Sequence, residues 1–179
     1  MKQHLTLPNQ LTILRLLLVP CIAFLMSVGF QDHMLWALAL FVLAMFTDTL
    51  DGEIARRRHL VTELGKFLDP LADKMLISTV LVIFVWQSMV PLWVVLIIIA
   101  REFLITGLRS VAASQGVVIA ATSWGKSKTL TQTIMIIIIY LVPTFSWLGY
   151  IVPYIVGIAT IATILSGLDY LWRYRRFVL

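Results

Sequence analysis

Long apolar stretches separated by short polar segments run along the whole chain of 179 residues. A helix that crosses the hydrocarbon core of a bilayer needs roughly 20 mostly apolar residues. Stretches near this length occur six times, and we predict a membrane-spanning helix at each of them. Their expected bounds are about 12–29, 34–55, 67–87, 91–112, 130–143 (extended at its start) and 148–172.

Composition supports the same interpretation. Hydrophobic residues make up 60% of the chain and charged residues only 13%, and the mean hydropathy is +0.96. A soluble domain of this length cannot bury so much apolar surface, which excludes the soluble class. The sequence therefore predicts an all-α integral membrane protein with a single domain, residues 1–179.

The basic residues fall on one side of the predicted membrane. Lys and Arg occur at both ends of the chain and in the segments after the second and fourth predicted helices, whereas the other three connecting segments contain none. This asymmetry predicts six spans with both termini in the cytoplasm. The net charge of +5 therefore indicates membrane orientation, and no nucleic-acid partner is expected. Arg101 is the exception, because it lies part-way along the fourth predicted helix.

Four carboxylates flank the basic segment after the second predicted helix. Asp48 and Asp51 are three residues apart, and Asp69 and Asp73 are four apart, so each pair shares one helix face. Two antiparallel helices joined by a short loop could direct all four at one another. Bare carboxylates there would repel and be costly to desolvate, so a divalent cation is expected. Oxygen ligands favour Mg²⁺ or Mn²⁺, and two ions fit four carboxylates better than one.

The depth of this cluster suits a substrate with a polar head and lipid tails, because the aspartates lie near the cytoplasmic ends of their helices. Gly52 and Gly65 remove side chains where a ligand could approach the backbone, and Arg56 could bind a diphosphate. Structural ion pairs and a divalent-cation transporter are the alternatives. The one-sided depth of the cluster and the lack of an internal repeat weigh against the transporter.

The pattern D-x-x-D-G-x-x-A-R, eight residues, then G-x-x-x-D-x-x-x-D, from Asp48 to Asp73, resembles the signature of the CDP-alcohol phosphotransferase family at every fixed position. The stretches "LPNQLTILR", "FLDPLADK", "AREFLITGLR" and "GKSKT" are similar to bacterial members whose acceptor is glycerol 3-phosphate. The resemblance implies a six-helix homodimer in the bacterial cytoplasmic membrane with its active site facing the cytoplasm. The implied reaction, part of phospholipid biosynthesis, transfers the phosphatidyl group of CDP-diacylglycerol to glycerol 3-phosphate and releases CMP.

The resemblance also implies residue roles. The metal ligands would be Asp48, Asp51, Asp69 and Asp73. Asp73 would also be the general base that takes the proton of the acceptor hydroxyl. The residues expected to bind CDP-diacylglycerol are Asn9, Thr12, Arg15, Gly52, Ala55, Arg56 and Gly65.

The acceptor is a separate question, because relatives in the family use several, and a cardiolipin synthase using phosphatidylglycerol is an alternative. Arg101 and Arg109 lie within about 80° of each other on one helix, and Lys126 and Lys128 precede the fifth predicted helix. A buried guanidinium needs an anionic partner. For Arg101 this is either Glu102 or a cluster aspartate, in a structural ion pair, or an acceptor phosphate shared with the other three basic residues. The set as a whole favours a phosphorylated acceptor.

Overall fold

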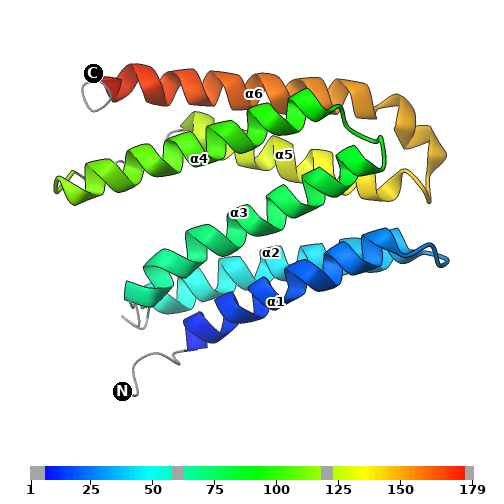
Figure 1. Ribbon diagram of the computed structural model, residues 1–179, viewed down its shortest axis with the longest axis horizontal. Coiled ribbons are helices and arrows are strands. Elements are labelled where there is room, and N and C mark those ends of the chain that lie inside the picture. Colours follow the sequence, from blue (N-terminus) through cyan, green and yellow to red (C-terminus); the bar gives the residue numbers. More distant parts are fainter. Residues whose placement is uncertain (1–6, 58–62, 118–122, 176–179) are drawn as a thin grey trace. The chain divides into compact units, whose positions relative to one another are not determined.

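The computed structural model describes residues 7–57, 63–117 and 123–175, with the backbone alone at 7, 8, 49–57, 63, 64, 66, 67, 123 and 126. This part of the chain contains six α-helices and no strand, which confirms the all-α prediction. The helices are α1 (Leu7–Ser27), α2 (His33–Arg57), α3 (Glu63–Trp86), α4 (Leu92–Ser114), α5 (Ser123–Leu141) and α6 (Val152–Arg173), and a short 3₁₀ helix, η1 (Ser146–Tyr150), precedes α6 (Figure 1).

The prediction for the last helix differs from the structure at its start. A continuous helix from residue 148 was expected, whereas the structure has η1 and then α6 from Val152. Pro153 explains the break, because proline lacks an N–H and fits an α-helix without strain only in the first turn. The expected extension of the fifth helix is confirmed, since α5 begins at Ser123 and includes the polar residues before residue 130.

The chain divides into two compact units, residues 1–84 and 85–179. In the first unit, α1 and α2 pack against each other as an antiparallel pair (Figure 1). Their connection includes Asp32 at φ 60, a left-handed conformation that Asp adopts more readily than most residues. Ile22, Phe41 and Phe84 are completely buried in this unit.

In the second unit, α6 packs against both α4 and α5. Ile105, Leu108 and Ala112 of α4 form a buried apolar cluster with Tyr170 of α6. Polar side chains are buried as well, and Gln132 of α5 donates a hydrogen bond from Nε2 to Thr163 Oγ1 of α6 at 2.9 Å. Each unit therefore has its own core.

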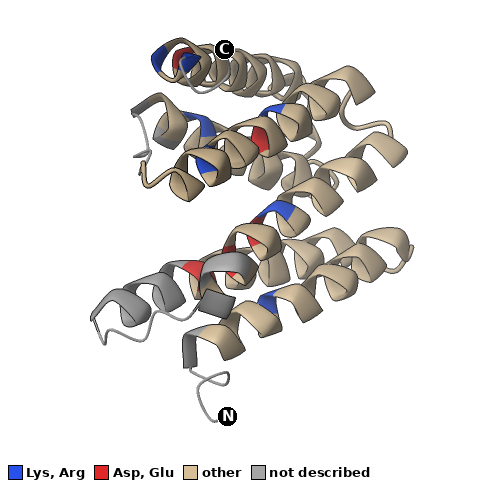
Figure 2. Ribbon diagram, turned by 60° about the vertical axis from the view of Figure 1, so that its left-hand side comes forward, with Lys and Arg blue, Asp and Glu red and all other residues tan. Residues whose placement is uncertain are grey.

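The outer faces of both units are strongly apolar, and charged residues are few along the ribbon in Figure 2. Phe24, for example, is 68% exposed and Phe103 58% exposed, as expected of side chains that face lipid. Within the described residues, two segments are long and apolar enough to cross a membrane, Asn9–Ser27 and Val152–Arg173. Shorter apolar helices cover His33–Asp48 and Ser127–Leu141 of the described residues, and the six-span arrangement stays a prediction.

Candidate functional site

Helices of the first unit bring carboxylates from α2 and α3 together at one arginine of α1. Arg15 Nη1 lies 2.9 Å from Asp48 Oδ1 and 3.1 Å from Asp73 Oδ1. Because both oxygens contact the same nitrogen, the two carboxylates lie beside each other. The facing arrangement expected from helical spacing is thus present for Asp48 and Asp73.

A second residue of α1 fixes the third carboxylate. Thr12 lies three residues before Arg15 and therefore shares its helix face. Its Oγ1 donates a hydrogen bond of 2.6 Å to Asp69 Oδ1. Arg15 is fixed further by its Nε, which donates to the carbonyl oxygen of Ala44 at 3.3 Å. One face of α1 therefore orients three of the four aspartates of the signature, which we call the acidic cluster: Asp48, Asp69 and Asp73.

The exposure of these side chains shows how the acidic cluster could receive a ligand. Arg15 is completely buried, whereas the side chains of Asp48 and Asp73 are 39% and 46% exposed. The guanidinium thus lies behind carboxylates that can be reached from outside. Carboxylate oxygens are the ligands that hard cations such as Mg²⁺ prefer.

The residues that could hold a metal are only partly described. Among the described side chains, no three His, Cys, Asp or Glu groups lie close enough together to hold one ion. Asp51, the fourth expected ligand, lies outside the described side chains, although the backbone of α2 continues in helical form through Arg57. The donor set fits a hard divalent cation in its chemistry, and the metal site itself stays a prediction.

Four of the seven residues expected to bind the donor are described with their side chains, and three are described by their backbone alone. Asn9, Thr12 and Arg15 are all buried, and the contacts of Thr12 and Arg15 with aspartates give these two a role that the sequence did not indicate. Gly65 is buried in α3. The remaining three, which lie in the helical backbone of α2 but outside the described side chains, are Gly52, Ala55 and Arg56.

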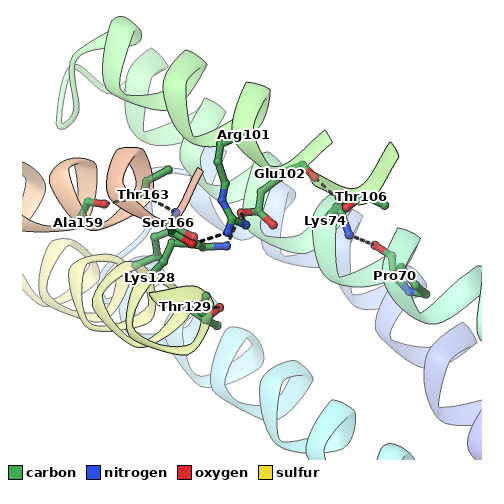
Figure 3. Close-up of polar contacts among 12 residues, drawn as sticks. Pro70, Lys74, Arg101, Glu102, Thr106, Lys128, Thr129, Ala159, Thr163 and Ser166 are labelled. Carbon is green, nitrogen blue, oxygen red and sulfur yellow. Dashed lines mark hydrogen bonds and ion pairs between the residues drawn. The ribbon is translucent and has the colours of Figure 1, made fainter. Parts of the chain in front are cut away.

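A second group of charges lies in the second unit, where α4, α5 and α6 converge (Figure 3). Glu102 Oε1 accepts a hydrogen bond from Arg101 Nη1 at 3.3 Å and forms an ion pair with Lys128 Nζ. The side chains of Arg101, Glu102 and Lys128 are 11%, 19% and 7% exposed. We call these three residues the cationic cluster, since one carboxylate here holds two cations. Of the anionic partners considered for Arg101, Glu102 is the one that it contacts in the structure, and the acceptor phosphate stays a prediction.

Arg101 makes two further contacts, both with α6. Its Nη2 donates to Ser166 Oγ at 2.5 Å, and its guanidinium carbon lies 5.5 Å from the ring centroid of Tyr170, within the range of a cation–π interaction. Its Nε is buried and has no hydrogen-bond partner among the residues that the structure describes. An unpaired buried donor costs about 1–3 kcal/mol, and an anionic ligand could relieve that cost after a small adjustment of the side chain.

The other two basic residues expected at an acceptor phosphate are not placed in this cluster. Arg109 is exposed, and its side chain makes no hydrogen bond or ion pair within the part of the chain that the structure describes. Lys126 lies outside the described side chains. Ser166 and Tyr170 were missed by the sequence reasoning, and the sequence signal near them was a polar residue beside Gly167.

Comparison with known proteins gives one consistent family. The model of the CDP-alcohol phosphatidyltransferase family matches residues 5–166. A protein of Bacillus subtilis (strain 168) named CDP-diacylglycerol–glycerol-3-phosphate 3-phosphatidyltransferase is 43% identical over 143 residues, which cover 73% of this chain and 74% of the relative.

Two further relatives extend the match along the chain. A Rickettsia bellii protein of the same name is 38% identical over 95% of this chain and 96% of its own length. A Mycobacterium tuberculosis protein named probable phosphatidylglycerophosphate synthase is 36% identical over 93% of this chain and 80% of the relative. Because the family model spans most of the chain and the signature from Asp48 to Asp73 lies within it, the protein belongs to the CDP-alcohol phosphatidyltransferase family.

Proposed function

We propose that this protein is a phosphatidylglycerophosphate synthase, which transfers the phosphatidyl group of CDP-diacylglycerol to glycerol 3-phosphate and releases CMP. The observation that carries the proposal is the similarity over nearly the full length to relatives whose names state this reaction. The two charged clusters support it independently. An excess of carboxylates suits a metal-bound diphosphate, and an excess of cations suits a phosphorylated acceptor.

The reaction makes one phosphorus–oxygen bond and breaks another. A hydroxyl oxygen of glycerol 3-phosphate attacks the β-phosphorus of the donor, which bears the lipid. The bond from that phosphorus to the oxygen bridging the two phosphates breaks, and CMP leaves with that oxygen. The hydroxyl proton passes to the carboxylate of Asp73.

The acidic cluster, together with Asp51, would hold one or two Mg²⁺ or Mn²⁺ ions. When bound, the ions offset the negative charge on the diphosphate and on the departing phosphate. The role of Arg15 and Thr12 is to keep Asp48, Asp69 and Asp73 in place, since they contact these carboxylates directly. Without Arg15, Asp48 and Asp73 would repel each other with no cation between them.

The donor would lie along the same helices. Gly52, Ala55 and Gly65 allow its nucleotide to approach the backbone closely, and Arg56 presents a planar fork to the diphosphate. Asn9, buried on the same face of α1 as Thr12 and Arg15, would complete the donor site.

The acceptor phosphate would bind Arg101 and Lys128, with Arg109 and Lys126 contributing from nearby positions in the sequence. Glu102 neutralises only one of the two cations that it contacts, so the cationic cluster keeps a positive charge in a region of low exposure. A phosphate monoester would satisfy that charge and the unpaired Nε of Arg101. Serine offers no phosphate, so it fits this cluster poorly.

The apolar outer faces support a location in a lipid bilayer, where the tails of the donor would reside. In this proposal the chain forms six spans in a bacterial cytoplasmic membrane, with the active site open to the cytoplasm, and it works as a homodimer. A cardiolipin synthase is the less favoured function, because the names of the similar relatives specify glycerol 3-phosphate.

An acceptor panel tests the proposal. Purified protein in detergent receives CDP-diacylglycerol, Mg²⁺ or Mn²⁺, and either glycerol 3-phosphate, phosphatidylglycerol, serine or inositol phosphate. CMP release is measured, and the lipid product is identified by mass spectrometry. We expect release with glycerol 3-phosphate alone. If none of the four acceptors causes CMP release, the protein is not an enzyme of this class. If only phosphatidylglycerol causes release, the proposed acceptor is contradicted.

A further inference from the structure

One face of α6 is specialised for contact with α4. Ser166 and Tyr170 lie four residues apart on this face, with exposures of 0% and 3%, and Gly167 is buried between them in the sequence. Residues with this spacing are neighbours on one side of a helix. Ser166 and Tyr170 both contact Arg101, which is a residue of α4 (Figure 3 shows Arg101 and Ser166).

The three residues of α6 restrain different parts of the Arg101 side chain. Ser166 Oγ accepts a hydrogen bond from Nη2, and the Tyr170 ring lies against the guanidinium. Gly167 leaves room for the stem, since a Cβ built at this position would lie 3.3 Å from Arg101 Cγ. Because the far end of the side chain is held by Ser166, Tyr170 and Glu102, the stem has little freedom to move away from an added methyl group.

This restraint matters because of how a guanidinium recognises phosphate. Its donors form a rigid planar fork, so binding depends on the orientation of that plane. A long side chain that is already ordered loses less entropy when a ligand binds than one that is free. A residue that fixes the plane can therefore control acceptor affinity without touching the acceptor.

We propose that Ser166, Gly167 and Tyr170 of α6 are positioning residues that set the affinity for the acceptor by fixing the orientation of the Arg101 guanidinium. The proposal rests on the proposed function, in which Arg101 binds the acceptor phosphate. It adds that α6 shapes the acceptor site although none of its residues belongs to the basic set recognised in the sequence. Substitutions here change the KM for the acceptor and leave the KM for CDP-diacylglycerol unaffected.

Two glycines of α6 provide a matched pair of variants. Gly167→Ala places a methyl group against the Arg101 stem, whereas a Cβ at Gly157 meets nothing within 4 Å. Both substitutions raise helix propensity equally. We expect Gly167→Ala to raise the KM for glycerol 3-phosphate about tenfold, since small displacements of a positioning group are costly. We expect kcat to change less than KM, and Gly157→Ala to behave like the wild type.

A second pair removes atoms and so avoids any steric clash. Ser166→Ala deletes the hydroxyl that accepts from Arg101. Thr160→Ala deletes a buried hydroxyl on the same helix that donates to the Val156 carbonyl oxygen. Only Ser166→Ala should raise the acceptor KM, by roughly threefold to tenfold, which is less than the loss of a whole hydrogen bond to a charged group because Ser166 acts through Arg101. The melting temperature of each variant in detergent is measured alongside.

The outcomes separate this inference from the proposed function. If the wild-type protein releases no CMP with glycerol 3-phosphate, the proposed function is contradicted, and the inference with it. If the wild type is active but Ser166→Ala and Thr160→Ala have the same acceptor KM, the positioning role alone is contradicted. If Gly167→Ala is too unstable to assay, Ser166→Ala decides the question.

Discussion

The two charged clusters are inverse in composition. In the acidic cluster, one guanidinium, that of Arg15, contacts the carboxylates of Asp48 and Asp73. In the cationic cluster, one carboxylate, that of Glu102, contacts Arg101 and Lys128. The first arrangement leaves an excess of negative charge and the second an excess of positive charge. A cation and a phosphate are the ligands that these two excesses would attract.

Burial differs as much as charge. In the acidic cluster the carboxylates are partly exposed and the arginine behind them is completely buried. In the cationic cluster the two cations are less exposed than the carboxylate that pairs them. The acidic cluster thus presents its ligand atoms outward, whereas the cationic cluster holds its cations in place with its own carboxylate. We therefore expect substitutions in the acidic cluster to affect chemistry and those in the cationic cluster to affect acceptor binding.

The largest effect is expected from Asp69→Asn, which keeps the shape of the side chain and removes its charge. Stabilisation of the transition state by a metal ion is worth several kcal/mol, so kcat should fall about 1000-fold. CMP release at saturating substrates measures this. Asp32→Asn is the control, because Asp32 is exposed in the turn between α1 and α2. If the Asp69→Asn enzyme keeps more than roughly a tenth of normal turnover, a role of this carboxylate in the reaction is contradicted.

Arg15→Met tests whether the buried guanidinium organises the acidic cluster. Outer-shell groups that orient metal ligands typically contribute about 10- to 100-fold in metal affinity, and we expect a loss of that size. Electron paramagnetic resonance measures the Mn²⁺ affinity of each variant and does not depend on turnover. Leu14→Met, at a neighbouring exposed position, should bind Mn²⁺ normally. Unchanged affinity in the Arg15 variant would leave the guanidinium without the role assigned to it.

Lys128→Met tests the cationic cluster. Hydrogen bonds to charged groups contribute about 1.5–3 kcal/mol, so the KM for glycerol 3-phosphate should rise roughly tenfold or more, with the donor KM unchanged. Arg173→Met is the control, because Arg173 forms an exposed ion pair with Asp169 within α6 and such pairs contribute little. A rise in donor KM instead would assign Lys128 to the other substrate.

The smallest effect is expected from Arg109→Ala. Arg109 is exposed, and an exposed charge contributes only about 0.2–1 kcal/mol to a pair, or up to roughly fivefold in acceptor KM. Steady-state kinetics at low ionic strength gives the best chance of detecting it, since salt screens such interactions. An acceptor KM equal to that of the wild type would exclude Arg109 from acceptor binding.

The six helices could be predicted from the pattern of apolar residues along the chain. The apolar runs predicted six helices because each run depends on neighbouring residues alone. The start of the sixth helix differs from the prediction because Pro153 fits only the first turn of an α-helix. The helical placement of the aspartates was also predictable, because a spacing of three or four residues fixes a shared face.

The partners of these residues were not predictable from spacing. Arg15 contacts Asp73, 58 positions away, and Arg101 contacts Ser166, 65 positions away. Such contacts depend on which helices pack together and at what rotation, and a single sequence does not specify either. The sequence therefore indicated an N-terminal arginine for the donor, whereas the structure places it against the aspartates. The sequence also gave no reason to connect α6 with Arg101.

The most direct test of the account is a cross-titration of two variants in one assay. Turnover of Arg15→Met and Lys128→Met is measured while Mn²⁺ is varied at saturating glycerol 3-phosphate, and then while glycerol 3-phosphate is varied at saturating Mn²⁺. The account predicts that Arg15→Met raises the half-saturating Mn²⁺ concentration and leaves the acceptor KM near normal, and that Lys128→Met does the reverse. If both variants shift both titrations equally, the assignment of metal binding to the acidic cluster and of acceptor binding to the cationic cluster is contradicted.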